Sequence, residues 1–403
     1  MKILQLTNKI PYPPKDGGAI ATLNMSRGLA DLGHEITILG MNTSKHYFDL
    51  NDIPLEIKEV ISFREVAVDT DLSFFAALKN LLLSDKPYNA ERFFNSEFNN
   101  KLKQLLQEKE FDIIQLEGLY LAFYIKTIRR YSKAVISLRA HNIEHEIWER
   151  NAVQEKSPLK KIYLRILARR IRKFKLKILN QYDLLIPITK RDATQFEMFG
   201  NKKPCLVVPA GYDTSRLQPQ SHKINFPSVF FIGTLDWFPN QEGLVWFIDK
   251  VWPKVLELHP GLVFHVAGRN APEWIISRFK KSSNINFLGE IDDAHKYITE
   301  NAVMIAPLFS GSGMRVKIIE GMALGKTIVT TTIGAEGIDV SPGENILIED
   351  HEHEFAARID ELLRNRKLFE TIGQKAIDFV KENYDNHRIT VSLAEFYKNH
   401  LTA

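Results

Sequence analysis

In the second half of this chain, short apolar segments are followed repeatedly by glycine or a polar residue. Four expected strands lie at 229–232, 263–267, 285–287 and 303–306, with helical patterns between most of them. Strands that alternate with helices predict a parallel sheet covered by helices on both faces. Such sheets bind ligands beyond the carboxyl ends of their strands, so this spacing predicts a binding site at that edge.

The first half starts with the same arrangement. A strand at 2–7 leads through a proline-rich loop into a helix at 19–32, and the loop ends in Gly17 and Gly18. The loop does not match G-x-G-x-x-G, but its glycines allow backbone N–H groups to approach a ligand.

The chain of 403 residues is too long for one core. Residues 217–227 are polar and contain two prolines, a composition typical of a linker. We therefore predict two domains, at 1–212 and 213–384, followed by a closing helical segment at 385–403.

Composition and charge exclude several classes of protein. The net charge of +4 is small for this length and gives no support to nucleic-acid binding. Cys205 is the only cysteine, so an intrachain disulfide framework is excluded and a reducing compartment is expected. The first residues lack the apolar core of a signal peptide, and no run of about 18 uncharged apolar residues is present. We expect a cytoplasmic protein without a membrane-spanning helix.

The stretch 309–338, FSGSGMRVKIIEGMALGKTIVTTTIGAEGI, carries the strongest ligand signal. Ser310 or Ser312 is expected to cap a helix, and the neighbouring glycines remove side chains where the backbone would meet a ligand. The free N–H groups of the first helical turn form an anion site, to which Arg315 and Lys317 add two cations. The alternative is an ordinary strand–helix–strand unit whose charges are solvated.

Two polar groups in the first half also follow expected strands. Glu117 comes directly after the strand 111–116, where a carboxylate is either a site residue or a partner of a helix N-terminus. The strand 134–138 is followed by the polar cluster RAHNIEHE at 139–146. We interpret His141 as a hydrogen-bonding or charge-stabilising residue, although a single histidine is often structural. The cluster lacks H-E-x-x-H spacing, so no metal site is predicted.

Two further helices have faces that could meet a partner. The helix expected at 157–179 carries an apolar stripe and many lysines and arginines, with no acidic residue between Lys156 and Lys177. Its basic face is either solvated or attracted to an anionic membrane surface, and no aromatic platform supports nucleic-acid binding. The segment 73–84 contains six phenylalanine and leucine residues and is either a core helix or an exposed acceptor or membrane surface.

Together these features resemble a known family. Two Rossmann-like halves facing a central cleft, with a linker and a closing helix, are similar to the GT-B fold. In detail the chain looks like glycosyltransferase family 4, the retaining group 1 transferases. The motifs that carry the resemblance are PYPPKDGGAIATLNMSRGLADLGHEITILG at 11–40, RAHNIEHEIWER at 139–150, VPAGYDTSRL at 208–217, FIGTLDWFPNQEG at 231–243 and GSGMRVKIIEGMALGKTIVTTTIGAEGI at 311–338. The resemblance also implies that the segment 385–403 packs back on the N-terminal domain.

The resemblance implies a donor site for a nucleoside diphosphate sugar. Glu320 corresponds to the second glutamate of the family's Glu-x7-Glu motif and is expected to hydrogen-bond the ribose hydroxyls. Ser312 stands where the first glutamate is usual, so the sequence is similar to the G-x-G-x-R-x-K-x-x-E branch. In that branch Arg315 and Lys317 are placed to contact the diphosphate. The other residues expected to bind the donor are Gly17, Gly18, Gly233, Thr234, Gly268, Arg269, Gly289, Glu290, Ile291, Ser312, Gly313 and Met314.

The implied reaction is transfer of the sugar to an acceptor hydroxyl of a glycan or lipid-linked precursor, with retention. His141 is expected to face the transferred sugar, and together with Arg315 and Lys317 it forms the predicted catalytic set. The acceptor side is assigned to Glu117, Asn142 and Glu144. No metal or other cofactor is expected, because the two cations and the helix N-terminus would stabilise the departing diphosphate. The alternatives are a nucleotide-sugar epimerase or hydrolase of the same fold, or a non-catalytic sugar-nucleotide-binding protein.

Overall fold

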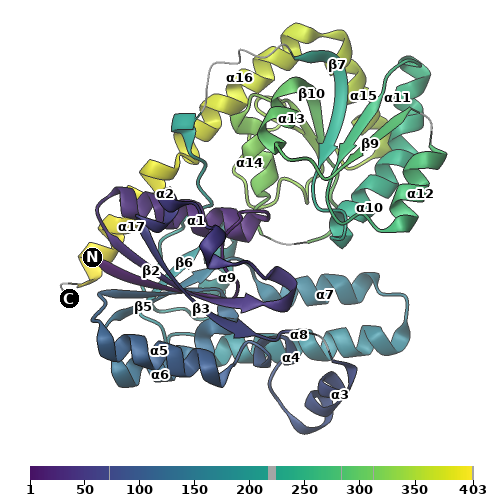
Figure 1. Ribbon diagram of the computed structural model, residues 1–403. Helices are drawn as coiled ribbons and strands as arrows, with labels where there is room; N and C mark the ends of the chain where they lie inside the picture. Colours follow the sequence, from purple (N-terminus) through teal and green to yellow (C-terminus); the bar gives the residue numbers. More distant parts are fainter. Residues whose placement is uncertain (72, 217–223, 283, 312, 402–403) are drawn as a thin grey trace. The chain divides into compact units, whose positions relative to one another are not determined.

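The structure is a computed structural model that describes residues 1–71, 73–216, 224–282, 284–311 and 313–401. The chain divides into two compact units, Met1–Gly211 with Asn386–Ala403, and Tyr212–Asp385. Each unit contains a six-stranded sheet whose neighbouring strands are all parallel, with helices on both faces (Figure 1). The predicted α/β fold class is confirmed.

The sheet of the first unit has the strand order β3-β2-β1-β4-β5-β6. Its strands are β1 (Lys2–Thr7), β2 (Glu35–Thr43), β3 (Ile61–Val68), β4 (Ile113–Glu117), β5 (Val135–Ala140) and β6 (Leu184–Pro187). The order reverses between β1 and β4, which pair from Ile3 with Ile113 to Leu6 with Leu116. In open parallel sheets such a reversal marks the binding edge, so the segments after β1 and β4 are the expected ligand-binding segments of this unit.

The α-helices of the first unit are α1 (Gly17–Asp31), α2 (Leu55–Lys58), α3 (Phe74–Leu83), α4 (Tyr88–Glu91), α5 (Ser96–Glu108), α6 (Ile125–Tyr131), α7 (Glu144–Gln154), α8 (Pro158–Ile178), α9 (Lys190–Met198) and α17 (Asn386–Leu401). Its 3-10 turns are η1 (Ser44–His46), η2 (Leu50–Asp52) and η3 (Leu119–Tyr124). Gly33, with φ of +79°, follows the end of α1.

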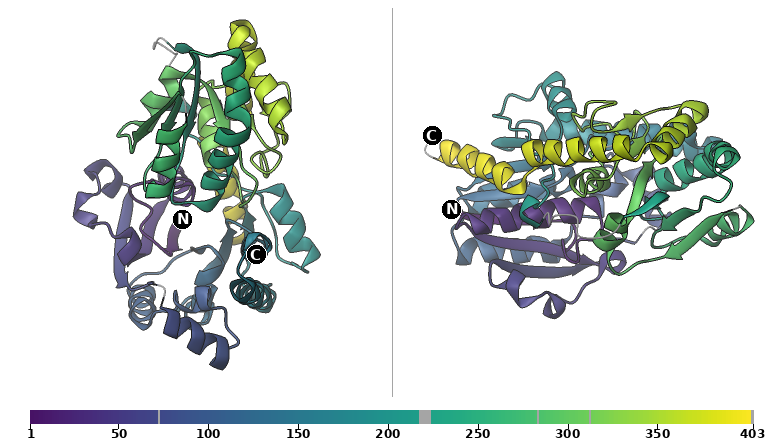
Figure 2. Two further views of the ribbon diagram at one scale, coloured as in Figure 1. Left: turned by 90° about the vertical axis from the view of Figure 1, so that its right-hand side faces the viewer. Right: turned by 90° about the horizontal axis from the view of Figure 1, so that it is seen from above.

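Although α17 ends the chain, it belongs to this unit and lies beside α1 (Figure 2). The close approach needs Gly28, because a Cβ there would lie 2.6 Å from Thr390 Cγ2.

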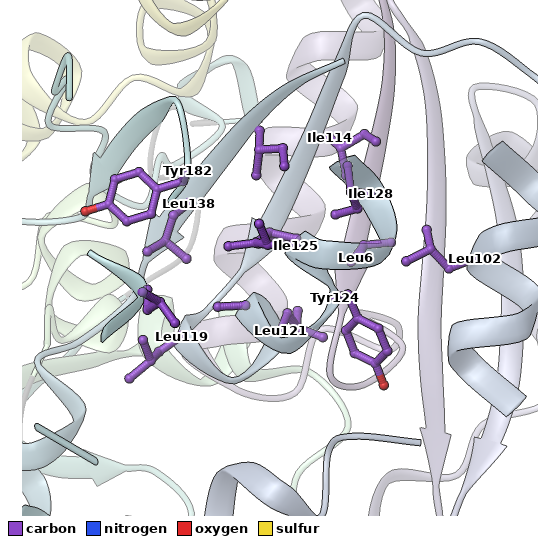
Figure 3. Packing of buried hydrophobic residues seen from close by; sticks show 14 of the residues in the cluster. Leu6, Leu102, Ile114, Leu119, Leu121, Tyr124, Ile125, Ile128, Leu138 and Tyr182 are labelled. Atoms are coloured by element: carbon purple, nitrogen blue, oxygen red, sulfur yellow. The ribbon is translucent and has the colours of Figure 1, made fainter. Parts of the chain in front are cut away.

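The two faces of this sheet are filled differently. One face carries a large apolar core, to which Leu102, Tyr124 and Ile128 contribute (Figure 3). The other face, under α1 and α17, combines apolar side chains with buried polar ones. The polar members are Gln5, Ser26, Gln115, Glu117, Ser137, Arg139 and Tyr397, each at most 5% exposed. Polar groups at such depth must find hydrogen-bond partners to be tolerated, and several of them meet below His141.

The sheet of the second unit has the order β12-β11-β10-β7-β8-β9. Its strands are β7 (Asn225–Ile232), β8 (Phe264–Ala267), β9 (Ile285–Gly289), β10 (Asn301–Ala306), β11 (Ile328–Thr330) and β12 (Leu347–Ile348). The order reverses between β7 and β10, which places the binding edge of this unit at the ends of those two strands. Because β7 begins at Asn225, the last three residues of the predicted linker at 217–227 are strand, whereas 217–223 lie outside the described residues.

The helices of the second unit are η4 (Thr214–Arg216), α10 (Phe238–Trp246), η5 (Phe247–Val251), α11 (Trp252–Leu258), α12 (Glu273–Lys281), α13 (Ala294–Glu300), α14 (Val316–Ala323), α15 (Glu352–Arg364) and α16 (Arg366–Asn383). The segment from α10 to α11 is helical throughout, but a π-helical turn, η5, lies between these two helices, and α11 carries Pro253 in its first turn. Proline has no N–H for the usual helical hydrogen bond, and this accounts for the irregular turn.

The basic helix predicted at 157–179 is present as α8, but its faces differ from the prediction. Lys175 is fully buried, with Nζ 3.4 Å from a Glu144 carboxylate oxygen and 5.0 Å from the Phe196 ring centroid. Leu159, expected in the apolar stripe, is 82% exposed, because the first turn of α8 extends with α7 beyond the sheet (Figure 1). Within the described ranges, no helix is both long and apolar enough to cross a membrane.

Candidate functional site

Three loops at the carboxyl edge of the second sheet are joined by backbone hydrogen bonds. Gly233 N–H donates to Ala267 O at 3.2 Å, and Gly268 N–H donates to Gly289 O at 2.8 Å. Glycine is required at 268, because a Cβ there would lie 2.2 Å from the Gly233 carbonyl oxygen. The loop after β8 also contains Arg269, whose carbonyl accepts from the N–H of Leu235 at 2.9 Å. The structure therefore brings the predicted donor residues that follow β7, β8 and β9 together along one edge.

The remaining predicted residues of these loops differ in exposure. Thr234 is half-buried, and its carbonyl accepts a 2.8 Å hydrogen bond from Asn240 Nδ2. Glu290 is exposed after β9, whereas Ile291 is half-buried and packs on the cluster that contains Ile298. Of these side chains, Glu290 is the one that solvent reaches most freely.

The segment after β10 forms a tight loop and not the predicted start of a helix. Gly311 and Gly313 have φ of +97° and +79°, a left-handed conformation that glycine adopts without strain. Ser310, expected as a helix cap, instead donates through its hydroxyl to Glu242 at 2.7 Å. Ser312 lies outside the described residues. Helix α14 begins only at Val316, after an N-cap at Arg315, so the prediction that a serine at 310 or 312 caps it is wrong.

Arg315 stabilises this loop. Its guanidinium donates to the carbonyl of Gly313 at 2.9 Å and lies 5.7 Å from the ring centroid of Trp237. The residue is only 5% exposed. Arg315 therefore stabilises the loop through its contacts with Gly313 and Trp237, a role that the sequence did not indicate. Its contact with a diphosphate stays a prediction. Met314, in the same loop, is half-buried against the apolar cluster around α14.

Lys317 brings a cation to the reversal point of the second sheet. Its Nζ donates to Asn240 Oδ1 at 2.9 Å and lies 4.3 Å from the ring centroid of Phe231. A Cβ at Gly233 would lie 3.4 Å from the same nitrogen, so the amine stands beside this glycine turn. Burial and the neighbouring positive charge of Arg315 lower the pKa of Lys317 to about 7. An amine in this state gains strongly from a bound anion, because the anion favours the protonated form.

Glu320 lies one turn further along α14, and its side chain is half-buried. Burial raises the pKa of its carboxyl to about 7. Among the described residues, this carboxyl has neither a hydrogen-bond partner nor an ion-pair partner. A carboxyl in such surroundings can gain hydrogen bonds from ligand hydroxyls, as predicted for the ribose.

In the first unit, His141 is held by a buried carboxylate. Its Nε2 lies 2.6 Å from Glu117 Oε2, and the imidazole keeps 19% of its surface exposed. Glu117 also accepts hydrogen bonds from Thr22, Arg139 and Gln115. Burial alone would raise the pKa of Glu117, but the Arg139 charge, the His141 ring and the hydrogen bond from Gln115 lower it to about 2. The arrangement is a rigid carboxylate that orients a histidine at the edge of the sheet.

The three residues assigned to the acceptor side lie in different surroundings. The side chain of Glu117 is 3% exposed and that of Glu144 is 12% exposed, where it pairs with Lys175. Asn142 is half-buried in the turn between β5 and α7. The two carboxylates therefore support neighbouring side chains in this structure, and His141 is the more exposed group.

The N-terminus of α1, where Gly17 and Gly18 lie, is capped by Asp16. The carboxylate of Asp16 accepts from the Ala19 N–H at 3.0 Å and pairs with Lys9 Nζ at 2.5 Å. It therefore satisfies part of the positive helix end that a phosphate would use. Contact of the two glycines with a donor or acceptor stays a prediction.

Comparison with known proteins identifies the family. The profile described as "Glycosyltransferase Family 4" matches residues 15–216, and that described as "Glycosyl transferases group 1" matches residues 226–365. The chain belongs to glycosyltransferase family 4. It is therefore a glycosyltransferase, in agreement with the prediction from its motifs.

Two curated relatives of this family 4 glycosyltransferase differ in how much of the chain they match. An uncharacterized 44.6 kDa protein in the cps region of Klebsiella pneumoniae is 26% identical over 403 residues, which cover 97% of this chain and 98% of that protein. An uncharacterized glycosyltransferase of Methanocaldococcus jannaschii is 25% identical over 207 residues, or 47% of this chain and 51% of that protein.

Solved structures share the GT-B fold of this family 4 member. HepE from Anabaena, in complex with UDP, has a TM-score of 0.69 at 15% identity, with 99% of this chain and 100% of that chain covered. Sucrose-phosphate synthase from Thermosynechococcus elongatus has a TM-score of 0.70 at 15% identity, with 99% of both chains covered. A variant of TarM from S. aureus, in complex with UDP and two further ligands, has a TM-score of 0.72 at 12% identity, with 98% of this chain and 99% of that chain covered.

Several residues of the family 4 site were missed at the level of sequence. Asn240 fixes Lys317, and Arg139 balances the charge of Glu117, but neither was expected there. Gln115 and Arg139 did carry a signal, since each is a polar residue inside a buried strand. Within the described residues, no group of three or more His, Cys, Asp or Glu side chains could hold a metal ion. The independence of the enzyme from metals stays a prediction.

Proposed function

We propose that this family 4 glycosyltransferase moves a sugar from a nucleoside diphosphate donor to an acceptor hydroxyl, with retention of the anomeric configuration. The observation that carries the proposal is Lys317, whose amine stands beside the Gly233 turn with its pKa lowered to about 7. A diphosphate would restore both the proton and an opposite charge, so a charge-assisted contact is favoured here over any neutral ligand.

The second unit is assigned to the donor. Lys317 contacts the diphosphate, and the backbone N–H groups around Gly313 add hydrogen bonds to it. Glu320 accepts hydrogen bonds from the ribose hydroxyls, and these bonds compensate for the water that its buried carboxyl has lost. Gly233 lets Asn240 and Lys317 approach this turn, because a Cβ there would lie 2.9 Å from Asn240 Nδ2.

The chemistry follows from the charges that develop. The bond between the anomeric carbon and the diphosphate oxygen breaks, negative charge grows on the diphosphate, and protonated Lys317 stabilises it. The acceptor oxygen forms the new bond to the anomeric carbon, and its proton passes to the departing diphosphate oxygen. Attack on the face that the diphosphate leaves gives retention without a covalent intermediate. We assign no metal or other cofactor, because Lys317 supplies the required positive charge.

The first unit is assigned to the transferred sugar and the acceptor. His141 is the exposed end of a fixed carboxylate–histidine pair, and we assign it a hydrogen bond to a hydroxyl of the sugar. The Glu117 carboxylate is enclosed by four donors, so it is not assigned as a nucleophile. A glycan or lipid-linked acceptor is supported by the Klebsiella relative, which is described as a protein in the cps region. HepE and TarM were solved with UDP, which makes UDP-sugars the first donors to test.

We also propose that the acceptor is met at an anionic membrane surface. Nine of the 21 residues of α8 are lysine or arginine and none is acidic. Arg170 of α8 donates to the Leu81 carbonyl of α3 at 2.8 Å, so α3 is attached to this basic helix. On α3, Phe75, Leu82 and Leu83 are 81%, 73% and 78% exposed, which argues against the core interpretation of this segment. Exposed apolar side chains beside basic ones are typical of helices that bind membrane interfaces.

The test of the proposed function is donor turnover. Purified protein is incubated with UDP-glucose, UDP-N-acetylglucosamine or GDP-mannose, with and without alkyl glycosides or a polyprenyl-linked sugar as acceptor. Released UDP or GDP is quantified, and the product is analysed by NMR for its anomeric configuration. The proposal expects release of UDP or GDP only when acceptor is present. It also expects the new glycosidic bond to have the same anomeric configuration as the sugar in the donor. Release without acceptor supports a hydrolase, epimerised donor supports an epimerase, and donor binding without turnover supports a non-catalytic protein.

A further inference from the structure

A buried chain of hydrogen bonds joins the last helix of the protein to His141. Tyr397 Oη, on α17, donates to Gln115 Oε1 at 2.6 Å. Gln115 Nε2 donates to Glu117, and the other carboxylate oxygen of Glu117 meets His141 Nε2 at 2.6 Å. Tyr397 and Gln115 are both fully buried, and every member belongs to the first unit.

The chain of hydrogen bonds has a single direction. A carboxylate can only accept, so Gln115 must turn its amide nitrogen toward Glu117 and its oxygen toward Tyr397. Tyr397 must then donate its proton to that oxygen. For the same reason His141 must present Nε2–H to Glu117, which leaves Nδ1 as the nitrogen available to a ligand. The Tyr397 hydroxyl on α17 is therefore connected, through Gln115 and Glu117, to Nε2–H of His141.

Packing alone does not explain this chain of hydrogen bonds. Apolar side chains of similar size would fill the space under α1 and α17 without the need for partners, as they do on the opposite face of the sheet (Figure 3). Loss of one member of a buried polar network leaves its neighbours without their hydrogen-bond partners. Tyr397 closes the network, with Oη also 3.0 Å from Ser137 Oγ.

We infer that Tyr397 and Gln115 are positioning residues that hold the Glu117 carboxylate and, through it, the ring plane and tautomer of His141. The last helix is thereby part of the machinery of the first unit, although it lies 282 residues from Gln115 in sequence. The inference rests on the proposed function, since it takes His141 as the group that meets the transferred sugar.

The first test compares Tyr397→Phe with Tyr182→Phe. Tyr182 is an equally buried tyrosine of the same unit, its hydroxyl lies 3.0 Å from Asn201 Oδ1, and it lines the opposite core (Figure 3). Each change deletes one buried hydroxyl, so similar losses of melting temperature are expected. We expect kcat for acceptor-dependent release of nucleoside diphosphate to fall roughly tenfold for Tyr397→Phe, with the KM for donor unchanged. Tyr182→Phe should stay within about twofold of wild type.

The second test asks whether the effect passes through His141. In a His141→Ala background, Tyr397→Phe should lower kcat no further, because the group that it positions is gone. Gln115→Met, which keeps the side-chain length but cannot donate, should reproduce the loss if Tyr397→Phe does not fold. In wild-type protein labelled with ¹⁵N-histidine, the His141 Nε2–H signal should be sharp, whereas Tyr397→Phe should broaden it and Tyr182→Phe should not.

Three results would overturn the inference. These are equal loss of kcat by Tyr397→Phe in both backgrounds, equal kcat for the two tyrosine variants, and an unchanged His141 signal in Tyr397→Phe. Absence of acceptor-dependent turnover in the wild type would instead contradict the proposed function. The NMR comparison needs no turnover and would still decide whether Tyr397 orders His141.

Discussion

Lys317 Nζ donates a 2.9 Å hydrogen bond to Asn240 Oδ1 and so joins α14 to α10 at the strand-order reversal of the second unit. Asn240 Nδ2 donates in turn to the Thr234 carbonyl at 2.8 Å, which fixes the direction of the amide. The lysine is therefore held in place by a neutral partner that leaves its charge uncompensated. This arrangement costs stability in the free protein and favours an anion that supplies the missing charge.

The first prediction concerns Lys317→Met. We expect the affinity for UDP or GDP to fall about 10- to 100-fold, because a charged hydrogen bond to the diphosphate is lost. The free variant should melt at a higher temperature than wild type, since a desolvated amine is removed. Isothermal titration and thermal unfolding measure both effects, with Lys296→Met, a change at an exposed lysine of the same unit, as control. Unimpaired nucleotide affinity in Lys317→Met would show that the diphosphate lies elsewhere.

The second prediction is a pH dependence of donor binding. The pKa of Lys317 is about 7 in the free protein, far below its usual value of 10.5, and a bound diphosphate should raise it. Above pH 7 the free amine is increasingly neutral and must take up a proton on binding. The dissociation constant for UDP should therefore rise with pH above about 7, by at most tenfold per pH unit.

Calorimetry at pH 8 in buffers of different ionisation enthalpy measures this proton uptake directly. At that pH Glu320, with a pKa of about 7, is already mostly ionised and contributes little. Lys317→Arg keeps a permanent charge and should bind without proton uptake. Wild-type binding that releases protons, or exchanges none, would contradict the assignment.

The third prediction uses Glu320→Leu to test the ribose contact. Wild-type protein should bind UDP more tightly than 2′-deoxy-UDP, because Glu320 accepts hydrogen bonds from both ribose hydroxyls. The variant should lose about 10- to 100-fold in UDP affinity but less in 2′-deoxy-UDP affinity, so that the preference disappears. Glu382→Leu, at an exposed position of α16, is the control. A preference that survives in Glu320→Leu would place the ribose against another residue.

Glu320 should also make the stability of the free protein depend on pH. Its folded pKa of about 7 is raised above the ordinary value of 4.5, so the protonated form is the one that folding favours. Its contribution is fully present below pH 4.5 and is lost as the pH rises through 7. Glu320→Leu should flatten the corresponding part of the curve of unfolding free energy against pH, measured with urea.

Local sequence patterns carried most of the fold because strands and helices are encoded by short-range periodicity. Positions at or just after the carboxyl ends of strands, such as Glu117, His141 and Gly268, could likewise be found because parallel strands share one carboxyl edge. The start of α14 was misplaced, since two left-handed glycines stop the backbone from entering the helix until Val316. Nothing in the residue types of that loop distinguishes a helical first turn from a tight bend.

Pairings between distant segments could not be predicted. Asn240 lies 77 residues from Lys317, and Tyr397 lies 282 residues from Gln115. Such contacts depend on which helices flank the reversal points and on how the last helix returns to the first unit. Polar residues inside buried strands, such as Gln115 and Arg139, were a local sign of a buried network, because apolar residues are expected at those positions.

The fourth prediction concerns the surface formed by α8 and α3. Arg165→Glu combined with Arg169→Glu should reduce flotation with phosphatidylglycerol-containing vesicles by about tenfold or more, because each exposed basic group contributes about 1 kcal/mol. Phe75→Ser should weaken flotation further by removing an exposed apolar contact. The control is a matched double reversal in the second unit, Lys280→Glu with Lys281→Glu, which should leave flotation unchanged. If the wild type floats equally well with neutral vesicles, the membrane proposal fails.

The fifth prediction concerns the charge of Glu117. Glu117→Gln leaves Arg139, which is fully buried, without its carboxylate, and loss of one partner of such a pair typically costs about 3–5 kcal/mol. Urea unfolding at pH 7 should show this loss, whereas Glu110→Gln, at an exposed position, should be nearly neutral. Replacing both partners, by Glu117→Gln with Arg139→Met, should recover part of the stability because the unpaired charge is removed.

The same carboxylate should make the protein less stable as the pH falls. Its folded pKa of about 2 lies below the ordinary 4.5, so its contribution to stability is complete above pH 4.5 and is lost as the pH falls toward 2. Glu117→Gln should therefore be less sensitive than wild type to acid over this interval. The Glu110→Gln control accounts for the effect of other carboxyls. If the unfolding free energy of the wild type then stays constant from pH 4.5 to pH 2, Arg139 does not hold Glu117 in its charged form.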